Sequence, residues 1–276
     1  MRIFVTGATG YIGSAVVHEL INAGHKVTGL TRSNKGAALL TEAGADVHRG
    51  DLRDLDSIRN GVAAADGVIH LAFNHDFSDF AASLTTDIAV IETIGEALKG
   101  SGKPFLTTAH ANGTASDNAV MALAKHGVRA SVVSLAPSVH GNGDKGFVPN
   151  LINIARNKGV SAYVGDGSNR WTAIHRLDAA HLYRLALEKA PAGTLLDGVA
   201  DEGVPFRDIA TVIGKQLNLP IISISQEEAA EHFGFLGTLA TLDIPRSSTQ
   251  TQELLDWQPV QPNLLSDLEQ GHYFKR

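Results

Sequence analysis

Short apolar runs alternate with longer amphipathic segments through the first half of the chain. The runs predict strands at 2–6, 26–31, 45–48, 67–71, 103–107 and 129–135. The segments between them have helical spacing and predict helices at about 12–23, 34–43, 54–64, 80–99 and 116–126. Strands that alternate with helices form right-handed βαβ units around a parallel sheet. The pattern therefore predicts an α/β fold with a doubly wound parallel sheet.

After Pro137 this alternation weakens. Loops rich in Gly, Asn and Asp occupy 141–146 and 165–169. Helical spacing returns at about 148–158, 177–189, 206–217, 226–234 and 248–256, with one further strand near 194–199. We therefore expect a sheet domain over 1–140, completed by the strand near 194–199. Residues 141–276 then form mostly a small substrate lobe that folds together with it.

Composition narrows the class of protein. The 276 residues are 43% hydrophobic and 19% charged, with a net charge of −6. This balance argues against a nucleic-acid-binding surface. The chain has no cysteine, which excludes disulfides, thiolate catalysis and cysteine-ligated zinc. No apolar stretch is long enough to span a membrane, and the N-terminus reads as a strand and not as a signal peptide. We expect a cytoplasmic protein without a membrane partner.

The first strand runs directly into a glycine-rich turn, Thr6 to Gly13, which opens a helix. Gly7 allows a sharp turn, Gly10 lets a pyrophosphate approach the backbone, and Gly13 lets the helix pack close to the strand. The helix N-terminus offers N–H groups and a partial positive charge to phosphates. Spaced glycines can also form an ordinary turn, but the strand before and the helix after favour a dinucleotide site.

The turn reads Thr-Gly-Ala-Thr-Gly-Tyr-Ile-Gly, which resembles the short-chain dehydrogenase/reductase superfamily, in its extended and atypical, epimerase/dehydratase-like branch. The resemblance implies a nicotinamide cofactor and continues through later segments of the chain. It implies that Asp51 and Leu52 contact the adenine, that the end of the fourth strand lines the cofactor, and that Pro137 and Val139 lie along the nicotinamide. The full set of expected cofactor contacts is Thr6, Gly7, Thr9, Gly10, Tyr11, Ile12, Gly13, Arg32, Ser33, Asp51, Leu52, Leu71, Ala72, Phe73, Pro137 and Val139.

The end of the second strand indicates which cofactor is bound. An acid there hydrogen-bonds the ribose of NAD, whereas a base neutralises the 2′-phosphate of NADP. The strand ends without an acid, and Arg32 and Ser33 follow it. This favours NADP(H) over NAD(H), although Arg32 alone could be an ordinary loop arginine. Asp51 has an alternative as well, because it could cap the helix that begins near Asp54.

The usual catalytic pattern of the superfamily, Tyr-x-x-x-Lys, is missing. None of the four tyrosines has a lysine four residues on: Tyr11, Tyr163, Tyr183 and Tyr273. Thr107 and Thr108 take the place of the hydroxyl that holds the substrate oxygen, and His110 or His140 would supply a proton. Each of these could instead be a strand-end, loop or packing residue.

The resemblance implies that later loops shape a substrate pocket. We expect substrate contacts from Asn74, Phe147, Arg170 and Trp171, and no metal. The function predicted is an NADP(H)-dependent oxidoreductase that transfers a hydride to or from a small carbonyl or alcohol. A non-catalytic NADP(H) sensor and a nucleotide-sugar epimerase or dehydratase are the alternatives. The expected partner is then a small molecule. The sequence does not decide whether the chain also forms a homodimer.

Overall fold

The computed structural model describes residues 1–74, 79–109 and 114–275, and its contacts divide the chain into two compact units. We call the first the sheet unit, made of Met1–Ser134, Ala179–Asp197 and Gln250–Trp257. The second is the lobe unit, made of Leu135–Asp178, Gly198–Thr249 and Gln258–Arg276. Each unit is assembled from three separate stretches of sequence. None of the described helices is both long and apolar enough to cross a membrane.

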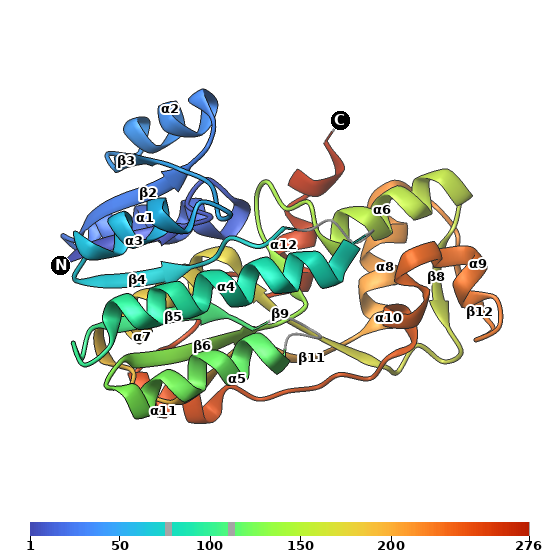
Figure 1. Cartoon of the computed structure of the whole chain (residues 1–276). Coiled ribbons are helices and arrows are strands. Elements are labelled where there is room, and N and C mark those ends of the chain that lie inside the picture. The colour runs from blue at the N-terminus through green and yellow to red at the C-terminus, as the bar shows by residue number, and fades with distance from the viewer. Residues whose placement is uncertain (75–78, 110–113, 276) are drawn as a thin grey trace. The chain divides into compact units, whose positions relative to one another are not determined.

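A mostly parallel seven-stranded sheet forms the centre of the sheet unit (Figure 1), which confirms the α/β prediction. Its order is β10-β6-β5-β4-β1-β2-β3. The strands are β1 (Arg2–Thr6), β2 (Lys26–Thr31), β3 (Asp46–Arg49), β4 (Gly67–His70), β5 (Pro104–Thr108), β6 (Arg129–Leu135) and β10 (Thr194–Gly198). Since β1 pairs in parallel with both β2 and β4, the strand order reverses at β1. Ligands of doubly wound folds bind at the carboxyl ends of the strands beside such a reversal.

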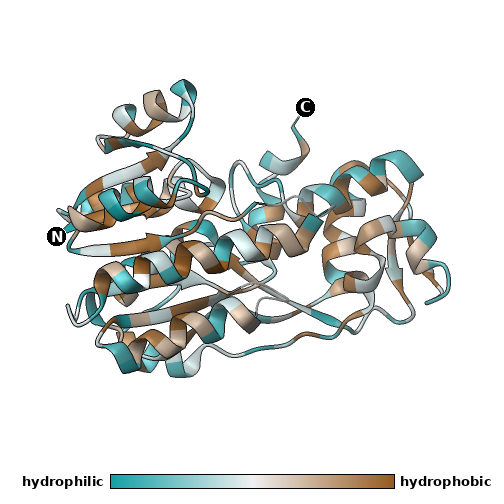
Figure 2. Cartoon of the chain, viewed as in Figure 1, coloured by the Kyte–Doolittle hydropathy of each residue, from teal (hydrophilic) through white to brown (hydrophobic). Residues whose placement is uncertain are grey.

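Helices flank this sheet. They are α1 (Tyr11–Asn22), α2 (Asn34–Glu42), α3 (Leu55–Ala63), α4 (Phe80–Leu98), α5 (Thr114–Ala122), η2 (Leu123–His126), α7 (Arg176–Lys189) and α11 (Thr249–Leu255). Apolar side chains of α3, α4 and α5 form one buried cluster with Phe4 of β1 and Phe105 of β5. Inner strands such as β4 are largely hydrophobic, whereas the helices carry both hydrophilic and hydrophobic residues (Figure 2). Ion pairs join α7 to the first helix and its following turn, through Arg184–Glu19 and Glu188–His25.

Two small sheets and several short helices make up the lobe unit. The strands β7 (Ser138–His140), β9 (Arg170–His175) and β11 (Asp201–Pro205) form one sheet, and β8 (Ser161–Val164) and β12 (Ile221–Ile224) form the other. The helices are α6 (Phe147–Lys158), α8 (Phe206–Leu217), α9 (Ala229–Phe233), η3 (Gly234–Leu236), α10 (Gly237–Thr241), α12 (Leu264–Glu269) and η4 (His272–Phe274). None of these five strands was predicted. The single helix expected at 226–234 is instead the short helix α9, which is followed directly by η3 and α10.

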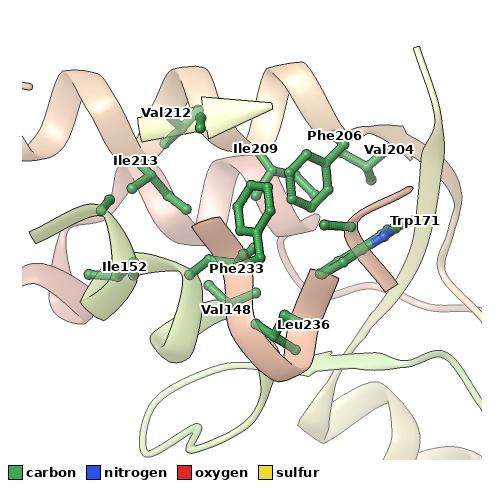
Figure 3. Packing of buried hydrophobic residues seen from close by; sticks show 14 of the residues in the cluster. Val148, Ile152, Trp171, Val204, Phe206, Ile209, Val212, Ile213, Phe233 and Leu236 are labelled. Atoms are coloured by element: carbon green, nitrogen blue, oxygen red, sulfur yellow. The ribbon is translucent and has the colours of Figure 1, made fainter. Parts of the chain in front are cut away.

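Trp171 belongs to the lobe unit's hydrophobic core (Figure 3). Its side chain is fully buried, its indole N–H donates to the carbonyl oxygen of Leu239 at 3.0 Å, and its ring packs edge-on against Phe206 at 4.9 Å between centroids. A large aromatic ring with its one polar atom satisfied is a stable core residue. This packing favours a core role for Trp171, and the substrate contact expected from the sequence stays a prediction.

Candidate functional site

The glycine-rich turn has the geometry that its sequence predicts. Gly7 has a φ of 69°, and a Cβ on it would lie 2.7 Å from the backbone nitrogen of Ala72. A Cβ on Gly13 would collide with the carbonyl oxygen of Gly7. Helix α1 begins after Gly10 with no side-chain cap and no acidic residue in its first turn. The first N–H groups of a helix have no partner within it, so this end can hold an anion.

A groove of about 580 Å³ opens beside this turn, and all of its lining belongs to the sheet unit. The lining residues are Gly7, Thr9, Gly10, Leu30, Thr31, Arg32, Ser33, Gly50, Asp51, Leu52, Arg53, Leu71, Ala72, Phe73, Asn74 and Thr86. The structure thus brings together most of the residues expected around the cofactor, and adds Asn74. Arg53 and Thr86 were not predicted. Arg53 could have been found, because it lies two residues beyond Asp51 in the same loop.

Three charged side chains gather at one end of the groove. Arg32 is 79% exposed, and its Nη1 lies 3.6 Å from Oδ2 of Asp51. The other carboxylate oxygen of Asp51 accepts from the backbone N–H of Arg53 at 3.0 Å and from its Nε at 3.2 Å. The bond from the Arg53 backbone is the largest cause that lowers the pKa of Asp51. Two arginines therefore share one carboxylate, and their positive charge exceeds its negative charge.

Ser33 and Asp54 cap the N-termini of the neighbouring helices α2 and α3. Asp54, and not Asp51, caps α3 by accepting from the N–H of Ser57 at 3.0 Å. Ser33 caps α2 by accepting from the N–H of Gly36 at 3.0 Å. Asp51 is thus left in the groove without a capping role, whereas the Ser33 hydroxyl is already engaged as an acceptor.

A chain of four buried polar side chains leads away from the glycine turn; we call it the Thr6–Ser116 chain. The Thr6 hydroxyl lies 2.6 Å from Nδ1 of His70, and Nε2 of His70 lies 3.1 Å from Oδ1 of Asp87. The hydroxyl of Ser116 donates to Oδ2 of Asp87 at 2.6 Å. Because a carboxylate only accepts, Nε2 of His70 donates to Asp87. His70 is therefore a satisfied core histidine.

Thr107 and Thr108 are the last two residues of β5, and their hydroxyls differ in burial and in hydrogen bonding. Thr107 is 3% exposed, and its hydroxyl has no hydrogen-bond partner among the described residues. Thr108 is half-buried, and its hydroxyl lies 2.6 Å from the phenol oxygen of Tyr183 on α7. Burial raises the pKa of Tyr183 far above its ordinary value, so that this phenol stays protonated. His110 lies outside the described residues.

His140 is fully buried in the lobe unit. Its Nδ1 lies 2.8 Å from Oδ2 of Asp267, and its ring packs edge-on against His175. Its Nε2 has no partner among the described residues. Burial, followed by the neighbouring His140, lowers the pKa of His175. Over the same described stretches, no group of histidine and acidic side chains is arranged to hold a metal.

The remaining predicted residues lie at different places in the lobe unit. Arg170 binds both carboxylate oxygens of Asp243, through Nε at 2.9 Å and Nη2 at 2.8 Å, and lines a hollow of about 470 Å³. Phe147 packs against the core around Trp171. Pro137 is exposed just before β7, and Val139 within β7 pairs with Ile174 of β9.

Comparisons with known proteins agree with this geometry. A model of the NAD dependent epimerase/dehydratase family matches residues 3–106. An uncharacterized protein of Schizosaccharomyces pombe is 48% identical over 99% of this chain and 100% of its own length. The 2-alkyl-3-oxoalkanoate reductase of Stenotrophomonas maltophilia is 29% identical over 80% of this chain and 77% of its own. The crystal structure of the dTDP-glucose 4,6-dehydratase DesIV from Streptomyces venezuelae, with NAD bound, has a TM-score of 0.76 at 16% identity, over 99% and 97% of the two chains.

The chain therefore belongs to the NAD dependent epimerase/dehydratase family, and the resemblance to extended short-chain dehydrogenases/reductases is confirmed. Membership places it among the NAD(P)-dependent oxidoreductases, epimerases and dehydratases of the extended type. The groove in the sheet unit fits a nicotinamide dinucleotide for two reasons. Gly7 and Gly13 stand where there is no room for a Cβ, and the first turn of α1 contains no acidic residue that would repel a phosphate.

Proposed function

We propose that this chain is an NADP(H)-dependent oxidoreductase that converts a small ketone and the corresponding alcohol into one another. The observation that carries the proposal is the charge at the end of the groove. Arg32 is largely exposed there, and the carboxylate paired with it among the described residues, Asp51, is already held by Arg53. A 2′-phosphate supplies the anion that these two guanidinium groups lack.

The bound cofactor supplies the hydride, and the chain supplies position and polarity. In this proposal the N–H groups of Tyr11, Ile12 and Gly13 hold the pyrophosphate, while Thr6 and Thr9 line the turn. Asp51 and Leu52 contact the adenine, and Pro137 and Val139 lie along the nicotinamide.

The substrate oxygen is held by a hydroxyl at the end of β5, from Thr108 or Thr107. His110, His140 or a water molecule is the proposed source of the proton. Asn74 lines the groove, and together with Phe147 and Arg170 it is proposed to contact the substrate. The relative in Stenotrophomonas maltophilia is by name a reductase of 2-alkyl-3-oxoalkanoates, which makes 3-oxo acids and their esters the first ketones to test.

The test mixes the protein with NADPH and a panel of 3-oxo acids and their esters, simple ketones and aldehydes, and follows the loss of NADPH absorbance. Arg32→Ala and Arg53→Ala are measured beside it, with NADPH and NADH titrated separately. Losing one charged contact to a phosphate weakens NADPH binding by roughly tenfold and leaves NADH unchanged. Equal affinity of the wild type for NADPH and NADH contradicts the assignment of the 2′-phosphate.

A second function is favoured by one specific feature of the sequence, the absence of a lysine four residues after any tyrosine. In this alternative the chain binds NADP(H) as a sensor and performs no chemistry. Tight NADPH binding with no turnover across the whole panel supports the sensor and overturns the reductase.

A further inference from the structure

We propose that Tyr183 is a positioning residue that fixes the Thr108 hydroxyl as a hydrogen-bond donor toward the substrate oxygen. The inference deepens the proposed function and rests on it. Both residues belong to the sheet unit, with Thr108 at the carboxyl end of β5 and Tyr183 inside α7. It also selects Thr108 over Thr107, which the sequence leaves open.

The direction of the hydrogen bond follows from burial. The side chain of Tyr183 is fully buried, and its phenol lies 2.6 Å from the Thr108 hydroxyl, the acceptor that the described residues offer it. An unsatisfied buried O–H is costly, so the phenol donates its one proton to Thr108. The hydrogen of Thr108 must then point away from Tyr183.

The surroundings of Thr108 allow that hydrogen to reach a ligand. Thr108 is only half-buried, in contrast to Tyr183. Successive strand residues face opposite sides, so Thr107 cannot share this arrangement, and its own hydroxyl is buried with no hydrogen-bond partner in the described part of the chain. Thr108 is therefore the hydroxyl at this strand end whose donor direction is already set.

Tyr183 holds this direction and does not exchange its proton. Burial raises its pKa, so the phenol remains a donor at neutral pH. In the reduction, the carbonyl carbon gains the hydride and the π pair of the C=O bond moves to oxygen. That oxygen takes its proton from water, which leaves as hydroxide. Thr108 stabilises the developing negative charge through its O–H and keeps its own proton, as preorganised donors do elsewhere.

Kinetics of Thr108→Val, Thr108→Ser, Tyr183→Phe and the double variant test the proposal on the ketone that the wild type reduces best. Removing one donor to a developing oxyanion lowers kcat roughly 100-fold, which we expect for Thr108→Val. Tyr183→Phe frees the hydroxyl to rotate and lowers kcat about tenfold, with KM within about twofold. The double variant matches Thr108→Val alone, and Thr108→Ser retains most activity. Tyr163→Phe, which removes a phenol that lines neither the groove beside the glycine turn nor the hollow at Arg170, is the matched control.

Urea unfolding gives a readout that needs no turnover. Thr108→Val strands the buried phenol without an acceptor and lowers the midpoint by about 0.5 M. Tyr183→Phe lowers it less, because the half-buried Thr108 can bond to water, and the double variant regains most of the loss. The NADPH affinity of all variants equals that of the wild type.

Three results overturn the inference: wild-type kcat in Tyr183→Phe, independent effects that multiply in the double variant, or a greater loss of stability in Tyr183→Phe than in Thr108→Val. Each of them leaves the proposed function standing if the wild type reduces the ketone. A wild type that binds NADPH and reduces nothing instead overturns the proposed function, and the catalytic role of Thr108 with it.

Discussion

A buried histidine–aspartate pair lies in each unit. The two pairs make the same kind of contact, but they differ in whether both histidine nitrogens are hydrogen-bonded. In the sheet unit, Nε2 of His70 lies 3.1 Å from Asp87; in the lobe unit, Nδ1 of His140 lies 2.8 Å from Asp267. Both nitrogens of His70 are hydrogen-bonded. His140 has one bonded nitrogen, and its Nε2 has no partner among the described residues.

This difference separates two uses of the same residue types. A buried polar network whose members are all satisfied fixes one arrangement of the core. His70 and Asp87 fit that description, and they link the glycine-rich turn at Thr6 to the start of α5 through Ser116. His140 is held in one orientation by a carboxylate while its other nitrogen stays unused. Because that nitrogen has no hydrogen-bond partner among the described residues, we retain His140 as a proposed catalytic group.

The largest effect is expected from breaking the complete pair. Asp87→Ala leaves the N–H of His70 and the O–H of Ser116 without acceptors, and a broken buried pair costs about 3 kcal/mol. Urea unfolding measures the loss of stability. Asp56→Ala, on the exposed surface of α3, is the control and changes stability by less than ~0.5 kcal/mol. A similar small change in Asp87→Ala would refute the view that this network is essential to the core.

An amide at the same position sharpens the comparison. Asp87 accepts on both of its oxygens, so Asp87→Asn turns an NH2 group toward one of two donors and costs about 2 kcal/mol. Asp267 accepts one strong bond, and the second imidazole near it, His272, lies 3.8 Å away. Asp267→Asn keeps that one acceptor and costs about 1 kcal/mol. Equal losses in the two variants, measured in the same unfolding experiment, would contradict the distinction between complete and incomplete pairs.

Ser116→Ala removes one donor and leaves the His70 bond intact. A single side-chain bond to a charged acceptor contributes about 1.5 kcal/mol, so the loss lies below that of either change at Asp87. Thermal unfolding with and without NADPH measures it. Ser266→Ala, at an exposed position of α12, is a matched control for the loss of a hydroxyl. A loss in Ser116→Ala as large as that in Asp87→Ala would show that His70 contributes nothing.

The smallest effect concerns pH and the histidine packed on His140. Burial lowers the pKa of His175 below its ordinary 6.5, and the groups around it are His140, Asp267, Asp178 and Arg176. At a pH near 6.5, His175 therefore binds fewer protons in the folded state than in the unfolded state. The stability that His175 contributes is present above its unfolded pKa and decreases as the pH falls through it toward the folded pKa.

His175→Asn removes this titration and preserves an acceptor for the N–H of Leu177, which His175 Nδ1 now binds at 3.2 Å. We expect the midpoint of urea unfolding to fall less steeply between about pH 7.5 and 5.5 in this variant than in the wild type. His126→Asn, on the exposed end of η2, serves as control and leaves the slope unchanged. If the midpoints of wild type and His175→Asn change with pH in parallel, His175 does not cause the pH dependence of stability.

The sequence predicted the parts that depend on local pattern. Short apolar runs predicted the strands of the large sheet, and the glycine spacing predicted the turn because Gly7 and Gly13 meet local steric limits. The sequence missed the small strands of the lobe unit, such as β7 and β12, which are only three or four residues long. Pairing across the chain, not local pattern, makes them strands.

The partners of the candidate residues depend on long-range contacts as well. Asp267 lies 127 residues beyond His140, and Tyr183 lies 75 beyond Thr108. No spacing rule connects such pairs. Trp171 shows the same limit, because only its burial against Phe206 and Leu239 separates a core aromatic from a pocket aromatic.

The interleaved order of the two units has a consequence for synthesis on the ribosome. Strand β10 (Thr194–Gly198) pairs with β6, yet residues 135–178 of the lobe unit are translated between them. Until residue 198 emerges, β6 is an open edge of the nascent sheet, and open edges are prone to pair with other chains. Helix α11 arrives later still. Neither unit can be released as an intact fragment by one cut of the polypeptide, so a nascent chain stalled near residue 190 should be a preferred client for chaperones.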